Sequence, residues 1–143
     1  ALAGFTGAIG LQVDDRDFSA LGAEAFIAPT QTDAIGVFIA EQRRFGWGTL
    51  QVGASVQDLG HTPEAALPDY AETAVSLAVG AGIDLTEAWR LTANLARTER
   101  NLAAEELYSD GAHLATRLFE VGILAAGDEA ETEVSWNLDL GIA

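Results

Sequence analysis

Six segments of the chain alternate apolar and polar residues with a period of two. In the clearest segment, apolar Leu50, Val52 and Val56 share one parity, while Gln51 and the other polar or small residues take the opposite one. This period is typical of β-strands with two unlike faces, whereas a helix would space its apolar residues three and four apart. We therefore predict six strands, with approximate bounds 5–14, 34–42, 49–57, 74–84, 90–98 and 133–142.

The connections between the predicted strands alternate between short and long. Residues 43–48 and 85–89 have lengths that are ordinary for hairpins, whereas residues 16–33, 58–73 and 99–132 form long connections. In an up-and-down meander this order places every long connection at the same end of the sheet. Bacterial outer-membrane barrels are arranged in this way, with short periplasmic turns and long external loops.

The fold class that follows is all-β, an antiparallel up-and-down meander of about six strands. The smallest single-chain bacterial barrels have about eight strands, so six strands are too few to close a wall in the membrane. We therefore interpret the meander as an arc of a large outer-membrane β-barrel, and we allow for a short helix in the last long connection.

A soluble antiparallel sheet with one wet face would show the same alternation, and it stays an alternative. Two details favour the membrane. The polar faces carry Gln, Asn, Ser and Gly, and the sequence contains no Lys, which soluble sheets commonly use to protect their edges. Trp47 and Trp89 lie beside the two short turns, where indoles would belong to a periplasmic aromatic girdle. The alternative is that they are two ordinary hairpin tryptophans.

Composition removes several function classes. Acidic residues outnumber basic ones 22 to 7, for a formal net charge of -15, so we expect no nucleic-acid partner. The absence of cysteine excludes disulfides, thiolate zinc sites and cysteine nucleophiles. The sequence has no apolar run of about 18 residues and no secretory leader, and we expect its first residue to be a cut end.

The last long connection carries the most specific sequence pattern. It contains Arg-Thr-Glu-Arg at 97–100, Ala-Glu-Glu-Leu-Tyr at 104–108, Gly-Ala-His at 111–113 and Phe-Glu-Val-Gly at 119–122, and Ser-Trp-Asn-Leu-Asp-Leu-Gly follows at 135–141. This order resembles the late-barrel region of TonB-dependent outer-membrane receptors, and it is most similar to their receptors for zinc or haem. The chain departs from the family at Asn101-Leu102 and at 123–131, where prolines are common in the family.

The resemblance implies a barrel of about 22 strands with an N-terminal plug, the large plugged class of outer-membrane transporters. This chain would supply six adjacent strands, without the plug, the TonB-contacting segment or the closing strand. The implied function is uptake of a scarce metal chelate, haem or zinc across the outer membrane of a Gram-negative cell, energised through TonB. The implied partners are outer-membrane lipid, that substrate, and TonB through the missing N-terminal region. We expect no cofactor.

Two histidines are candidate metal ligands in the long connections. In haem receptors of the family a histidine of the loop that matches His113 contacts the iron, and imidazole binds zinc and haem iron well. His61 lies near Asp58 and Glu64 on the same predicted side, and two imidazoles with carboxylates could capture zinc. The alternative is that both histidines only form hydrogen bonds or are solvated.

Enzyme readings have little support. The sequence contains no Gly-x-Ser-x-Gly, no His-Glu-x-x-His and no glycine-rich phosphate loop. Ser109, Asp110 and His113 could form a triad, but neighbours in sequence rarely have the required geometry. We predict that the chain is not an enzyme. The alternative to a transport receptor is a soluble or small-barrel β-sheet module that binds or supports without transport.

Overall fold

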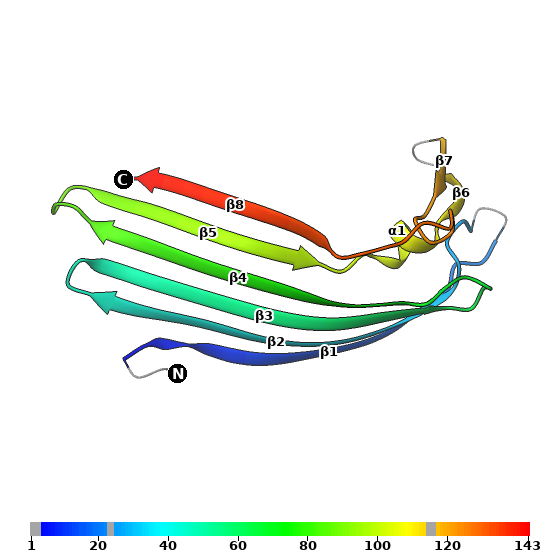
Figure 1. The fold of residues 1–143 in the computed structure, drawn as a ribbon, viewed down its shortest axis with the longest axis horizontal. Coiled ribbons are helices and arrows are strands. Elements are labelled where there is room, and N and C mark those ends of the chain that lie inside the picture. The colour runs from blue at the N-terminus through cyan, green and yellow to red at the C-terminus, as the bar shows by residue number, and fades with distance from the viewer. Residues whose placement is uncertain (1–3, 23–24, 114–116) are drawn as a thin grey trace.

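The computed structural model describes residues 4–22, 25–113 and 117–143, except for the side chain of His113. It contains six long strands, a short hairpin and one short helix (Figure 1). The elements in chain order are β1 (Thr6–Phe18), β2 (Thr30–Phe45), β3 (Gly48–Pro63), β4 (Tyr70–Asp84), β5 (Arg90–Arg100), α1 (Ala104–Tyr108), β6 (Asp110–His113), β7 (Leu118–Val121) and β8 (Glu133–Ile142).

The six long strands form one sheet in the order β1-β2-β3-β4-β5-β8, and every neighbouring pair is antiparallel. The predicted all-β meander of six strands is therefore confirmed, as is the short helix in the last long connection. The sheet is not closed: among the described residues, β1 and β8 each pair with one neighbour only. No described helix is long and apolar enough to cross a membrane.

Several strands run further than the alternation predicted. β3 continues past residue 57 to Pro63, and its partner β4 begins at Tyr70, directly opposite His61. The backbone ladder extends there because its hydrogen bonds need an extended neighbour and not an apolar side chain. The connection predicted over 58–73 is consequently reduced to residues 64–69.

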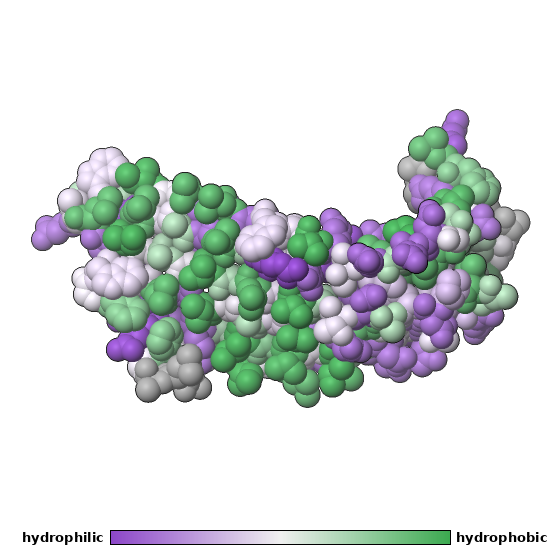
Figure 2. All heavy atoms as spheres, in the orientation of Figure 1, coloured by the Kyte–Doolittle hydropathy of each residue, from purple (hydrophilic) through white to green (hydrophobic). Residues whose placement is uncertain are grey.

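The register places the predicted apolar positions on one face of the sheet. Residues directly opposite each other in an antiparallel ladder point to the same face. One such line across the strands is Val52, Val79, Leu95 and Leu138. We call this side the apolar face, and its large side chains are exposed from β1 to β8 (Figure 2). The opposite side, with Gln51, Ser76 and their neighbours, is the polar face.

The buried core lies elsewhere, on the polar face at the end where α1 and the β6-β7 hairpin gather (Figure 1). Its buried apolar members are Tyr70, Leu102, Ala104, Leu107 and Tyr108, which we call the loop cluster. Tyr70 has the same parity as Ser76 on β4, so the last long connection packs against the polar face. The core of this chain is therefore made by a connection and a strand end.

Candidate functional site

The chain after β5 builds the candidate site by folding back onto the polar face. α1 buries Leu107 and Tyr108 completely against the strands, while its first turn carries the exposed Glu105. The carboxylate of Glu106 accepts the backbone N–H of Ala103 at 2.8 Å, which satisfies a donor that the helix start leaves open. A helix of five residues is too short to be stable on its own, so these contacts stabilise it.

Residues 122–125 close the other end of α1. The N–H of Ile123 donates to the carbonyl of Glu106 at 2.9 Å, and that of Leu124 donates to Leu107 at 3.1 Å. A Cβ on Gly122 would lie 2.4 Å from the backbone of Leu107, so only glycine permits this approach. The glycine of the Phe-Glu-Val-Gly pattern thus has a packing role.

His61 is the polar centre of the site and is almost fully buried. Its Nε2 lies 3.0 Å from the carbonyl oxygen of Leu102, and its Nδ1 lies 2.8 Å from the hydroxyl of Thr32. A carbonyl only accepts, so we assign the proton to Nε2, and Nδ1 then accepts the Thr32 hydroxyl. Burial lowers the pKa of His61, against the opposing effect of its bond to Leu102. A neutral imidazole therefore joins β2, β3 and the last connection.

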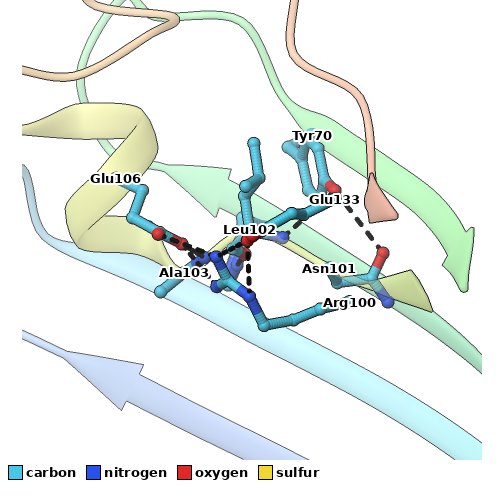
Figure 3. Close-up of polar contacts among 8 residues, drawn as sticks. Tyr70, Arg100, Asn101, Leu102, Ala103, Glu106 and Glu133 are labelled. Carbon is cyan, nitrogen blue, oxygen red and sulfur yellow. Dashed lines mark hydrogen bonds and ion pairs between the residues drawn. The ribbon is translucent and has the colours of Figure 1, made fainter. Parts of the chain in front are cut away.

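Two tyrosines surround this histidine. The ring centroid of Tyr70 is 5.8 Å from that of His61, and Tyr108 meets the imidazole edge-on at 6.4 Å. The backbone N–H of Leu102 donates to the Tyr70 hydroxyl at 3.3 Å, and that hydroxyl donates to Asn101 at 3.4 Å (Figure 3). Tyr108 donates to the carbonyl of Pro68 at 3.1 Å, and burial raises its pKa to about 12. Both phenols are thus neutral and act as hydrogen-bonding groups.

An ion-pair group closes the connection at its two ends (Figure 3). Arg100, the last residue of β5, binds both carboxylate oxygens of Glu106, at 2.8 and 3.0 Å. The same guanidinium donates from Nε to Glu133, the first residue of β8, at 3.1 Å. Hydrogen bonds from Arg100 and Ala103 hold the pKa of Glu106 below its usual range. Arg100 therefore joins the start and the end of the 101–132 insertion.

The predicted metal ligands are not brought together. Asp58 accepts the Thr73 hydroxyl at 2.9 Å and, opposite Ile35, lies on the apolar face, whereas His61 lies on the polar face. Glu64 is exposed in the 64–69 connection. Within the described part of the chain, no group of three His, Asp or Glu residues could hold a metal ion.

His113 pairs through its backbone with Leu118 in the β6-β7 hairpin, and its side chain lies outside the described residues. Metal binding by His113 or His61 stays a prediction. At His61 a metal would have to displace the Thr32 hydroxyl or the Leu102 carbonyl. The hydroxyl of Ser109, considered for a triad, donates to the backbone carbonyl of Glu105.

Most of this site could not be predicted from the sequence. Thr32, Tyr70 and Leu102 come from three separate segments, and no local motif connects them. One signal was present, since the chain has only two tyrosines and both lie in the loop cluster. Beside the cluster, a depression of about 490 Å³ opens between Phe26, Ile27 and α1. Glu105, Glu106 and Glu120 contribute carboxylates to its lining.

The arrangement offers positioning more than reactivity. Every polar group at its centre is engaged by the protein itself, and the outcome is a connection held rigidly across one end of the polar face. Comparison with known proteins gives no matching family model, no similar curated protein and no similar solved structure, so the inferences below depend on this chain's own residues.

Proposed function

We propose that the chain is part of the wall of an outer-membrane transport receptor that takes up a metal chelate, haem or zinc with energy passed on through TonB. One observation carries the proposal: each of the six antiparallel strands exposes large apolar side chains on the apolar face. A face of this extent needs an apolar partner. Lipid hydrocarbon is the partner that an open meander with two free edges fits best, once further strands complete the wall.

The loop cluster supports a receptor in particular. In a completed wall the polar face lines the interior, and the connection anchored by His61 lies across its mouth. Such a connection narrows the entrance and presents the β6-β7 hairpin to an arriving substrate. The resemblance of 97–122 and 135–141 to zinc and haem receptors supports the same assignment.

Replacement of residues 101–131 by a short Gly-Ser linker in the complete polypeptide tests this function. We expect the variant to reach the outer membrane, because the six-stranded sheet remains, and to lose binding of haem or of a zinc chelate by whole cells. The matched control replaces residues 86–88 of the β4-β5 turn in the same way and should retain binding.

Two results would contradict the proposal. Recovery of the unaltered protein as a folded monomer without detergent would favour the soluble β-sheet module. Unchanged binding of both substrates after the loop replacement would remove the receptor role from this connection.

A further inference from the structure

The outer border of the apolar face does not run straight across the strands. On β2 the face ends at Asp33, which is opposite Gly60 of β3. On β3 it ends at Asp58, two residues closer to the short turns. Asp58 is opposite Thr73 of β4. On β5 the border is Arg97, which is opposite Leu77 of β4, and Leu77 lies four residues closer to the short turns than Thr73. The border therefore shifts by six residues toward the short turns between β2 and β5.

The inner border shifts in the same direction. On β2 the exposed apolar residues end before Glu41, whose own side chain is buried and which is opposite Val52 and, one strand further, Val79. On β4 the apolar parity continues four residues beyond Val79, to Ile83 at the end of the strand. Both borders are therefore oblique, and between them lies a slanted band that we call the apolar belt.

A flat hydrocarbon slab crossed by tilted strands produces this slant. Six residues correspond to about 20 Å along a strand, and the three strand spacings from β2 to β5 correspond to about 14 Å. Asp15 is opposite Asp33, so the border does not shift between β1 and β2. Counting from β1 therefore spreads the same six-residue shift over four strand spacings. The resulting strand tilt is roughly 45–55°, close to the 35–45° of membrane barrels. On β4 the belt spans residues 75–83, near the 9–11 residues that a tilted strand needs.

We propose that the apolar belt contacts the hydrocarbon core of a lipid bilayer whose plane crosses the strands obliquely, with Arg97 at the outer headgroup border. The inference rests on the proposed function, and it adds the depth of each residue. Val37 on β2 and Val79 on β4 lie at the same mid-depth. Val75 lies near the outer border, although it shares a line across the strands with Val37.

Arg97 gives the clearest reason for the slant. It lies on the apolar face between Leu77 and Trp136, in the same line across the strands as Ile39. If the bilayer lay perpendicular to the strands, this guanidinium would be placed near mid-belt, where a charge on the lipid side is most destabilising. In the oblique placement Arg97 reaches the headgroups, paired with Glu99 and beside an exposed indole at Trp136. Tryptophan prefers that border.

The other border has matching chemistry. The guanidinium of Arg43 lies 4.9 Å from the ring centroid of Phe45 and 5.7 Å from that of Phe5. Phe45 stacks on the half-exposed Trp47 at 5.2 Å. A cation among aromatic rings beside a short turn is suited to the inner headgroup layer.

Single cysteines at Val37, Val75 and Val79 test the placement; residues 1–143 contain no other cysteine, and any cysteine elsewhere in the complete polypeptide is replaced by serine. Each variant of the complete polypeptide carries a fluorophore and is reconstituted into phosphatidylcholine–phosphatidylglycerol vesicles with a nitroxide at mid-chain or at the headgroup. We expect mid-chain quenching at Val37 and Val79 to be equal and about twofold stronger than at Val75. Val75 should be quenched better from the headgroup. Ser55→Cys, on the polar face, is the matched control that neither nitroxide should quench.

The outcomes separate the two levels of inference. Equal mid-chain quenching at Val37 and Val75 would overturn the oblique placement and leave lipid contact intact. Absence of quenching at all three positions, in a protein that unfolds cooperatively, would overturn the belt and the proposed function together. Stronger quenching at Ser55 than at Val79 would place the lipid on the polar face, and it would overturn both the apolar belt and the proposed function.

Discussion

The apolar face and the loop cluster hold the same kinds of side chain in opposite states. Leu107 in the cluster has no exposed surface, whereas Leu140 on the apolar face is 72% exposed. Most of the buried apolar residues belong to the cluster, while large apolar side chains on every strand of the sheet face outward. The apolar side chains of the cluster thus bury one another, whereas in the sheet the backbone is paired but the large apolar side chains stay exposed.

This difference shows where each region obtains its stability. The sheet is held by ladder hydrogen bonds from β1 to β8, and many large side chains of its apolar face stay exposed within the described chain, so they gain little hydrophobic free energy there. The loop cluster gains that energy internally, through a few side chains around His61. If the apolar face meets lipid as we propose, changes in the cluster should act without lipid, and changes on the apolar face should act only with it.

Leu107→Ala should give the largest effect. Removing a fully buried leucine side chain costs about 2–5 kcal/mol. We expect faster amide hydrogen exchange in α1 and in the β6-β7 hairpin, in detergent and in lipid alike, with the ladder from β1 to β4 unchanged. Leu85→Ala, in an exposed short turn, is the matched control. Equal exchange in the two variants would mean that the cluster does not hold the connection.

Val79→Arg should give the second largest effect, and it should do so only in lipid. A charge at mid-belt costs about 2–4 kcal/mol of folding free energy in a bilayer, measured by denaturant titration of refolding into vesicles. The control is Ala78→Arg, one residue along on the exposed polar face. Gly80 is unsuitable, because its Cβ would lie 2.4 Å from the side-chain oxygen of Asn94. Similar losses at residues 78 and 79 would contradict the assignment of faces.

The sheet could be predicted from sequence because its determinants are local. Alternation over a few residues fixes a strand and its two faces, and the register then places Val52, Val79 and Leu95 on one side. The strand ends were less predictable. Asp58 on the apolar parity and Leu59 on the polar parity interrupt the alternation, yet the ladder runs through both of them.

The loop cluster could not be predicted because its contacts are distant in sequence. His61 was singled out for its imidazole, but its partners Thr32 and Leu102 lie 29 and 41 residues away. Thr32 looks the same in sequence as any threonine of a strand. Only the pairing of β2 with β3 places its hydroxyl against the histidine.

Thr32→Val should give a smaller, local effect that sharpens this contact. The change keeps the shape of the side chain and removes the hydroxyl, which leaves the buried Nδ1 of His61 without its donor, at a cost of about 1–3 kcal/mol. Hydrogen exchange at Leu102 and Tyr108 should rise. Thr62→Val is the control, because Thr62 is exposed on the opposite parity of β3. A rise of the same size in both variants would remove the special role of the histidine.

Acidification should give the smallest effect, through Glu106. Its pKa is lowered in the folded chain by Arg100, so its carboxylate contributes stability that is complete above the ordinary value of 4.5 and is lost as the pH falls through the lowered one. The pair is partly exposed, so the contribution is about 1 kcal/mol or less. Hydrogen exchange in α1, corrected for intrinsic rates, should therefore stay constant from pH 7 to about 5 and accelerate only below. Glu106→Gln should flatten this acid limb, whereas Glu129→Gln, at an exposed position, should leave it unchanged. An acid limb that persists in Glu106→Gln would assign the acid sensitivity to another group and separate it from the ion pairs that join the ends of the connection.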